Sequence, residues 1–218
     1  MSKRKKIRMD RKLLNSELGR IGAQKYRELP ESGIVLVLDN IRSAHNIGSA
    51  FRTSDAFKVD RIFLCGICAA PPSAEIHKSA LGAEDAVPWE KVQDTLQLVE
   101  QLQTEGYTVV AVEQTENAVS LESFRIGANS PKSGASMDGA QEEGWQRGNS
   151  KAAEAGIRYA LIFGNEVDGV QQSVVDAADL SVIIPQYGTK HSLNVSVSIG
   201  VVLWELTRQA LEIKAVEG

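Results

Sequence analysis

Five short apolar runs constrain the fold of this chain more than any other feature. They lie at residues 33–39, 61–65, 107–113, 157–164 and 180–185. The first reads "GIVLVLD", a continuous apolar run of the kind that is buried on both faces of a parallel sheet. Segments with helical spacing separate the runs, at 46–59, 90–105 and 170–178. This alternation predicts an α/β domain with a mostly parallel sheet and helices on both faces.

The last apolar segment, residues 193–213, gives two conflicting signals. Its first residues, "LNVSVSI", alternate apolar and polar side chains as a half-buried strand does. Over a longer window, one helical stripe holds Val195, Ile199, Val202 and Leu206, and the next holds Val197, Val201 and Trp204. We therefore predict a helix from about Asn194 that is apolar on two sides and hence buried.

The first 30 residues differ in charge from the rest of the chain. They hold 10 Lys and Arg against 3 Asp and Glu, a balance of +7, whereas the remaining 188 residues carry −11. A basic arm on an acidic body suggests a polyanionic partner such as nucleic acid, although a solvated tail explains the charges equally well. Within this arm, residues 11–29 are predicted to be helical, with an apolar face made by Leu13, Leu14, Leu18 and Ile21. The chain thus divides into a basic extension, 1–30, and a domain, 31–218.

Residues 126–156 interrupt the alternating pattern. The segment is rich in Gly, Ser, Ala and Asn and has no apolar period, which predicts a flexible surface insertion. No apolar run is long enough to span a bilayer, and no apolar signal-peptide core follows the basic N-terminus. We therefore expect a soluble cytoplasmic protein.

The cysteines form the sequence "CGIC", which is compatible with a zinc site, a redox dithiol or two structural thiols. A zinc site needs a second pair of ligands, and the chain has no cysteine besides Cys65 and Cys68. Cys65 ends the apolar run "RIFLC", which favours structural thiols and leaves a redox α/β protein as a competing hypothesis. The histidines, His45, His77 and His191, are scattered, so no metal is expected.

The loop after the first run argues against the common nucleotide-binding families. It reads "LDNIRSAHNIGSAFR" and lacks G-x-G-x-x-G, and the chain has neither a phosphate-binding loop nor a nucleophile elbow. Polar clusters instead follow three of the predicted strands, at 40–52, 164–169 and 185–194. Ligands of open α/β sheets bind outside the carboxyl ends of the strands. We therefore expect the three clusters to converge on one site.

Three segments, in order, resemble the motifs of the SpoU/TrmH branch of the SPOUT RNA methyltransferases. They read "NIRSAHNIGSAFRTSDAF", "LIFGNEVDGV" and "IIPQYGTKHSLNVSVSIGVVLWE". The match covers about residues 34–208, apart from the insertion. The resemblance implies S-adenosylmethionine as methyl donor and a ribose 2′-hydroxyl of RNA as acceptor. It also implies a homodimer and a C-terminal deep trefoil knot, which no periodicity indicates.

The resemblance assigns catalytic roles to single residues. Arg52 matches an arginine that acts on the ribose hydroxyl or the adjacent phosphate. Because a guanidinium stays protonated, we favour a clamp on phosphate and developing alkoxide over a general base. Asn46 reads as a helix N-cap that could also orient Arg52 or the substrate. Glu166 matches the motif glutamate and could hold the substrate or Arg52.

The start of the last motif supplies two further catalytic candidates, Ser192 and Asn194, which can bond the ribose, the phosphate or Glu166. Their neighbour His191 has no firm counterpart in the family and is a candidate RNA contact only. In the first loop, Asn40 is expected to shape the backbone through an Asx-type bond.

The resemblance implies that S-adenosylmethionine is held largely by backbone groups of the knot loops, at Gly164, Ile184 and Leu193. Gly164 is also expected to let a ligand approach the backbone closely. The chain departs from many relatives at Val167, where they carry glycine, which leaves the shape of this turn open.

RNA contacts are expected from the basic extension, at Lys3, Arg4, Lys5, Lys6 and Arg8. Because the strand at 34–38 already begins the catalytic unit, no full-size RNA-binding domain precedes it, which favours tRNA over ribosomal RNA, as in the compact TrmH type. Two alternatives stay open. One is the same reaction on ribosomal RNA, and the other is a catalytically silent RNA-binding member of the family, against which the intact motif residues argue.

Overall fold

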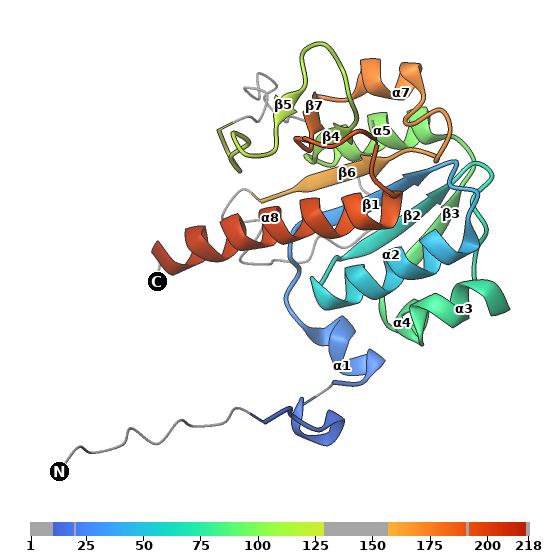
Figure 1. Ribbon diagram of the computed structural model, residues 1–218, viewed down its shortest axis with the longest axis vertical. Helices are drawn as coiled ribbons and strands as arrows, with labels where there is room; N and C mark the ends of the chain where they lie inside the picture. The colour runs from blue at the N-terminus through green and yellow to red at the C-terminus, as the bar shows by residue number, and fades with distance from the viewer. Residues whose placement is uncertain (1–10, 20, 129–156, 191, 217–218) are drawn as a thin grey trace.

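A parallel sheet forms the centre of the molecule in the computed structural model, which describes residues 11–19, 21–128, 157–190 and 192–216 (Figure 1). Its seven strands follow the order β3-β2-β1-β6-β4-β7-β5, and every neighbouring pair is parallel. The strands are β1 Ile34–Asp39, β2 Arg61–Cys65, β3 Trp89–Val92, β4 Thr108–Val112, β5 Val119–Ser120, β6 Tyr159–Phe163 and β7 Leu180–Ile183. The expected RNA contacts in residues 1–10, His191 and most of the insertion at 126–156 lie outside the described residues.

Helices cover both faces of this sheet, as the sequence predicts, with α2 and α8 on one face and α5 and α7 on the other (Figure 1). They are the 3-10 turn η1 Asn15–Glu17, α1 Ala23–Glu28, α2 Ala44–Ala56, α3 Ala74–Ala80, α4 Ala83–Ala86, α5 Thr95–Thr104, α7 Gln172–Ala177 and α8 Val195–Val216. None of the helices in the described ranges has the length and apolar character that crossing a bilayer requires.

The central strand β1 explains why the first apolar run is continuous. Leu36 and Leu38 belong to the hydrophobic cluster that includes residues of α2 and α8. Val35 and Val37 belong to the opposite cluster, with residues of α5 and α7. Because alternate side chains of a strand point to opposite faces, a strand covered on both sides must be apolar at every position.

The predicted helix over 90–105 is wrong at its start. Residues Trp89–Val92 form the edge strand β3, which pairs with β2, and the helix begins only at Thr95. Asp94 caps it, because its Oδ1 accepts hydrogen bonds from the backbone N–H groups of Leu96 (2.9 Å) and Gln97 (3.2 Å). A cap of this kind fixes where a helix starts.

The single helix predicted over 11–29 is also wrong. The described part of this segment contains η1 and the six-residue helix α1 instead. Leu13, Leu14, Leu18 and Ile21 are exposed, so the predicted apolar face is not packed on the domain. Tyr26 anchors α1, since it is buried and its hydroxyl donates to the backbone oxygen of Val59 at 3.0 Å.

The predicted C-terminal helix is confirmed as α8, which shows that the strand-like alternation at its start is accidental. One stripe is buried, as expected, and consists of Val195, Ile199, Val202 and Leu206. The prediction that both sides are buried is wrong for the single chain, because the second stripe stays exposed at Val197 (50%), Val201 (38%) and Trp204 (61%).

Candidate active site

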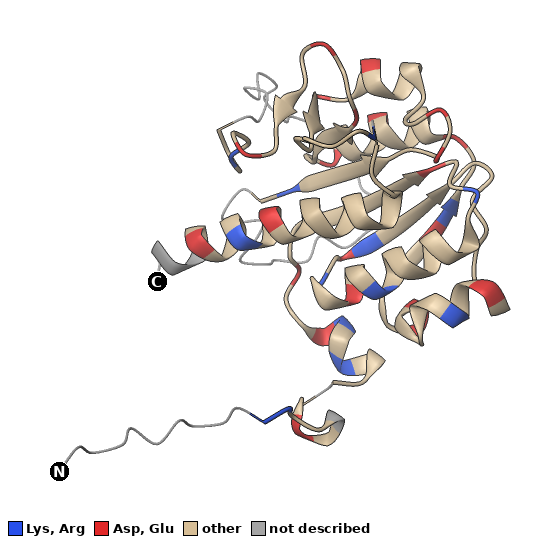
Figure 2. Ribbon diagram, viewed as in Figure 1, with Lys and Arg blue, Asp and Glu red and all other residues tan. Residues whose placement is uncertain are grey.

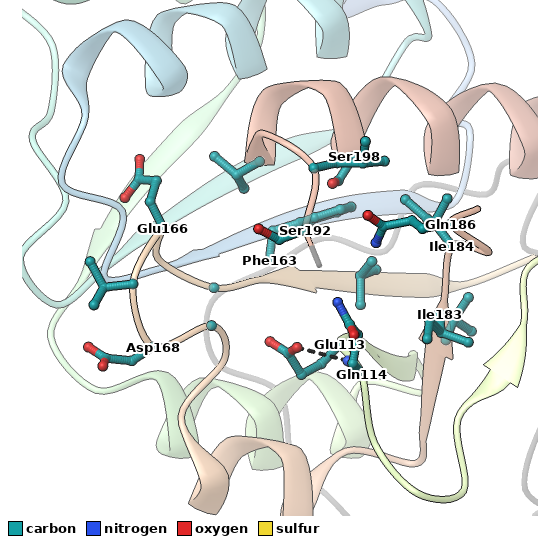
Figure 3. Close-up of a pocket in the computed structure, with 17 residues that line it drawn as sticks. Glu113, Gln114, Phe163, Glu166, Asp168, Ile183, Ile184, Gln186, Ser192 and Ser198 are labelled. Atoms are coloured by element: carbon teal, nitrogen blue, oxygen red, sulfur yellow. Dashed lines mark hydrogen bonds between the residues drawn. The ribbon is translucent and has the colours of Figure 1, made fainter. Parts of the chain in front are cut away.

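A pocket of about 270 Å³ lies at the carboxyl ends of β4, β6 and β7. Open parallel sheets bind their ligands at this edge. Residues of four chain segments line the pocket, within 112–114, 163–169, 182–186 and 192–198 (Figure 3). The second and third polar clusters that the sequence indicates therefore meet at one place.

The structure brings most of the candidate residues to this pocket. The expected cofactor-binding residues Gly164, Ile184 and Leu193 all line it, and so do Glu166 and Ser192. Asn46 and Asn194 lie beside the lining and reach it through hydrogen bonds. Arg52 is different: it sits on an exposed part of α2 and is not among the residues that line the pocket.

Asn46 connects the first polar cluster to the other two. Its Nδ2 donates to Glu166 Oε1 at 2.8 Å, and its Oδ1 accepts from Asn194 Nδ2 at 3.3 Å. The expectation that Asn46 caps α2 is wrong, because Ser43 is the cap and its Oγ accepts from the backbone N–H of Asn46 at 3.2 Å. With Ser43 as the cap, the Asn46 amide is available for contacts between the loops.

Glu166 belongs to the loop after β6, and its carboxylate lies against the N-terminal end of α2. Several groups there donate hydrogen bonds to it. Burial alone would raise the pKa of Glu166, but the hydrogen bond from Asn46 and further bonds from the backbone N–H groups of Arg42 and Ser43 lower it below the ordinary value. These contacts fix an ionised carboxylate at the rim of the pocket, because they favour the charged form.

The loop from Gly164 to Gly169 is closed by its own backbone. Asn165 and Gly169 exchange two hydrogen bonds of 3.1 Å, and Asn165 Oδ1 accepts from the backbone N–H groups of Val167 and Asp168, both at 2.9 Å. Val167 has an ordinary negative φ, so the turn does not need the glycine that relatives carry there. Asn165 thus fixes the conformation of this loop, a role that the sequence analysis did not predict.

Gly164 is required by packing within the protein. A Cβ at this position would lie 1.9 Å from the backbone carbon of Gly169 and 2.0 Å from the backbone nitrogen of Val170. The returning loop therefore requires glycine at this position, and the expectation that Gly164 also lets a ligand approach the backbone stays a prediction.

Asp39 ties this loop to the centre of the sheet. It is fully buried, and its Oδ1 accepts from Thr95 Oγ1 at 2.6 Å and from Gln171 Nε2 at 3.0 Å. Its Oδ2 accepts from the backbone N–H of Gln171 at 3.1 Å. A buried carboxylate satisfied in this way fixes the chain segment that follows the loop.

Asn40 acts differently from the expected Asx-type bond. It has a positive φ of 56°, and its Oδ1 accepts from the backbone N–H of Ile67 at 3.2 Å. The side chain therefore holds the loop after β2 instead of turning its own loop.

The two cysteines are buried and free, and they belong to the framework beneath these loops. Burial raises the pKa of Cys65 to about 12 and that of Cys68 to about 11. Cys68 Sγ accepts from the backbone N–H of Ile41 at 3.1 Å and donates to the backbone oxygen of Leu38 at 3.2 Å. Thiols that are buried and protonated react slowly, which is the behaviour of structural cysteines.

Sequence reasoning also missed two lining residues, Glu113 and Gln114, at the carboxyl end of β4. Glu113 ends the predicted strand "YTVVAVE" and Gln114 follows it, and this position at a carboxyl end is the signal that could have found them. The described lining thus contains three carboxylates, those of Glu113, Glu166 and Asp168.

The lining combines apolar surface with negative charge. Ile183, Ile184 and Leu193 supply aliphatic groups, and none of the described residues that line the pocket is Lys, Arg or His. Such a pocket suits a ligand that carries a flat apolar group and a positive charge. Among the described residues, no cluster of three or more side chains could hold a metal ion.

Comparison with known sequences identifies relatives over most of the chain. The model of a family described as the SpoU rRNA Methylase family matches residues 33–204. The 23S rRNA (guanosine-2'-O-)-methyltransferase RlmB of Neisseria meningitidis serogroup B is 31% identical over 181 residues, which are 83% of this chain and 60% of that protein. The tRNA (guanosine(18)-2'-O)-methyltransferase of Aquifex aeolicus is 26% identical over 205 residues, which are 94% of this chain and 82% of that protein. The chain thus spans well under two thirds of the rRNA-modifying relative.

Solved structures share the fold. The A. aeolicus TrmH/SpoU tRNA modifying enzyme superimposes with a TM-score of 0.66 at 24% identity, over 87% of this chain and 83% of that one. The AdoMet-bound rRNA methyltransferase of Sinorhizobium meliloti gives a TM-score of 0.64 at 24% identity, over 84% of this chain and 59% of that one. The parallel sheet and its flanking helices are therefore an arrangement known from other proteins.

Proposed function

The chain belongs to the SpoU rRNA Methylase family, and we propose that it transfers a methyl group from S-adenosylmethionine to a ribose 2′-hydroxyl of structured RNA. The observation that carries this proposal is the pocket at the ends of β4, β6 and β7, beside which Asn46 links Glu166 to Asn194. The relatives named above are 2′-O-methyltransferases of tRNA and ribosomal RNA, which agrees with this assignment.

The residues of the pocket fit S-adenosylmethionine. When bound, this molecule supplies a methyl group on a positively charged sulfur. Ile184 and Leu193 offer backbone groups and aliphatic surface for an adenine ring, and Gly164 adds further backbone to the same lining. The carboxylates of Glu113 and Glu166 offer the opposite charge to the sulfur.

The work of the protein in this reaction is to position the acceptor. The ribose 2′-oxygen forms a bond to the methyl carbon, the carbon–sulfur bond breaks with its electron pair left on sulfur, and the hydroxyl proton passes to solvent water. We propose that Glu166, held by Asn46, and Ser192 orient the ribose, and that Arg52 binds the adjacent phosphate and stabilises the developing alkoxide. Arg52 is exposed on α2 and therefore accessible to a bound RNA.

Transfer RNA is the substrate class that we propose first. The tRNA-modifying relative of Aquifex is matched over 82% of its length, whereas the rRNA-modifying relative of Neisseria is matched over 60%. The basic extension 1–30 is proposed to bind phosphates, because the rest of the chain is strongly acidic. A cytoplasmic location belongs to the same proposal, since that is where tRNA is modified in bacteria such as these relatives.

We further propose a homodimer and a C-terminal trefoil knot. The homodimer is supported by the exposed apolar stripe of α8, at Val197, Val201 and Trp204, because adjacent exposed apolar side chains often mark a protein–protein contact. Figure 2 shows that this first half of α8 carries no charged side chain. The knot is supported by the way in which the segments 163–169 and 182–198 line one pocket.

Methyl transfer from labelled S-adenosylmethionine to unmodified tRNA and ribosomal RNA tests the proposal. Digestion of the product should yield a 2′-O-methyl nucleoside, with tRNA labelled in preference to ribosomal RNA. If the chain binds RNA and the donor but no 2′-O-methyl nucleoside forms, the catalytically silent alternative is correct. Preferential labelling of ribosomal RNA would leave the reaction standing and reverse the order of the substrates.

A further inference from the structure

Glu113 places a carboxylate in the wall of the pocket from the carboxyl end of β4. Its Oε1 accepts from the backbone N–H of Gln114 at 2.8 Å, and its Oε2 accepts from the backbone N–H of Val170 at 2.9 Å. In Figure 3, Glu113 and Gln114 lie on the side of the pocket opposite Ser192 and Ser198. Because each oxygen is held by a backbone N–H, the carboxylate is fixed in place.

The loop that lines the pocket is shaped around this carboxylate. Gly169 has a positive φ of 70°, and a Cβ added there would lie 2.2 Å from Glu113 Oε2. Only glycine combines this backbone conformation with room for the carboxylate. The presence of glycine at this position is therefore tied to the presence of Glu113.

The charge of Glu113 has no partner of opposite sign in the part of the chain that is described. No ion pair there involves Glu113, and the lining residues that the structure describes include no Lys, Arg or His. Glu166 is engaged at the start of α2, and Asp168 lies on the exposed turn of its loop. Glu113 is thus a lining carboxylate that is fixed by two backbone N–H groups and has no ion-pair partner among the described residues.

We propose that Glu113 makes the pocket select its ligands by charge, favouring S-adenosylmethionine over the thioether that remains after methyl transfer. This inference rests on the proposed function. The two molecules differ by one methyl group and by the positive charge on sulfur, and a pocket discriminates weakly against the loss of a methyl group alone. A carboxylate about 6 Å from the sulfur would favour the cation by about 100-fold at an effective dielectric constant of about 20, and by about threefold in bulk water. Glu113 would thereby help the product to leave when the donor is abundant.

Binding calorimetry on the full chain tests this role with three ligands of similar size. S-adenosylmethionine and sinefungin carry a positive charge at or beside the sulfur position, and S-adenosylhomocysteine does not. In Glu113→Gln, the ratio of the dissociation constant of S-adenosylhomocysteine to that of S-adenosylmethionine should fall about tenfold, and the ratio to sinefungin should fall with it. A residue that only supports the loop would weaken all three ligands by the same factor, and that result would overturn the proposal.

Two variants serve as matched controls. Gln114→Glu adds a carboxylate to the same wall and should increase the preference for the two cations. Glu116→Gln removes an exposed charge three positions beyond Glu113, outside the lining, and should leave the ratios unchanged. If the wild-type chain binds none of the three ligands, the proposed function fails and this inference fails with it. If all three bind and the ratios in Glu113→Gln equal those of the wild type, only the role of Glu113 is refuted.

Discussion

Asn46 and Glu166 are 120 positions apart in the chain, yet the amide of one donates a 2.8 Å hydrogen bond to the carboxylate of the other. The same amide accepts a hydrogen bond from Asn194, so a single side chain joins all three polar clusters. The contact therefore couples the start of α2 to both loops that line the pocket.

Loss of Asn46 should reduce turnover much more than donor binding. Asn46→Ala removes both bonds and leaves Glu166 without its amide donor, so we expect kcat to fall about 100-fold, because a small displacement of a reacting group costs that much. Asn46→Asp should be at least as severe, since it places a second carboxylate against Glu166. Steady-state kinetics and calorimetry separate the two effects. Asn117→Ala, at an exposed asparagine, is the control, and a normal kcat in Asn46→Ala would contradict the role.

Arg52 should matter for RNA and not for the donor. Arg52→Ala should lower methyl transfer by about 100-fold or more while the affinity for S-adenosylmethionine stays within about threefold of the wild type, as expected for a group that stabilises charge in the transition state. Arg52→Lys should recover only part of the rate, because lysine cannot bind a phosphate bidentately. Lys78→Ala removes an exposed cation of α3 and should be nearly neutral. Equal losses of methyl transfer in Arg52→Ala and Lys78→Ala would show that Arg52 contributes only a non-specific surface charge.

Gly164 and Gly188 offer a test of the loop with a built-in control. A methyl group at Gly164 would overlap the backbone of Gly169 and Val170, so Gly164→Ala should shift the loop and weaken donor binding by at least about tenfold. A Cβ at Gly188 meets nothing within 4 Å, so Gly188→Ala should bind the donor normally. Comparable affinities in the two variants would show that the pocket tolerates a displaced loop.

Cys68 should contribute to stability through its two backbone contacts. Cys68→Ala leaves the N–H of Ile41 without its acceptor and should cost about 1–3 kcal/mol in the free energy of unfolding, measured in urea. Cys68→Ser keeps a group that can both accept and donate and should cost less. Methyl transfer by the folded variants should persist at neutral pH, and its abolition by loss of the thiols would favour the redox hypothesis.

The raised pKa values of the thiols predict a loss of stability in alkali. In the unfolded chain a cysteine ionises near its ordinary value of 9.0, whereas the folded chain keeps Cys65 protonated to about pH 12. Between these values the unfolded state binds fewer protons, so the free energy of unfolding falls as the pH rises. Cys65→Ala should show a shallower decline above about pH 9 than the wild type. Parallel declines in urea titrations of the two proteins would contradict this assignment.

Five strands could be predicted from the sequence because a strand buried on both faces is apolar throughout, as β1 illustrates. The edge strand β3 was not predicted, because "WEKV" is only half covered and mixes charged with apolar residues. The short helices α3 and α4 escaped because neither is long enough to show a period. Ser43 and Asn46 are both good helix caps, and the choice between them depends on Glu166, which no local rule can place.

The candidate site also contains positions that could be predicted from the sequence and positions that could not. The positions of Gly164, Ile184 and Leu193 came from the resemblance, because residues of these types otherwise indicate only a turn and a core. Glu113 is the last residue of a predicted strand, but its importance depends on Gly169 and Val170, which are more than 50 positions away and reach it only in the folded chain.

The place of β6 in the sheet has a consequence for the synthesis of this protein. β1 has β2 on one side and β6 on the other, and Ile34 lies opposite Tyr159. A ribosome must therefore complete about three quarters of the chain before the middle of the sheet can close, and it must reach Ser198 before the pocket has all its walls. Pairings between such distant segments are slow to form. A nascent chain that stalls before β6 would thus leave the edges of β1 and β4 unpaired, and it would depend on chaperones until translation resumes.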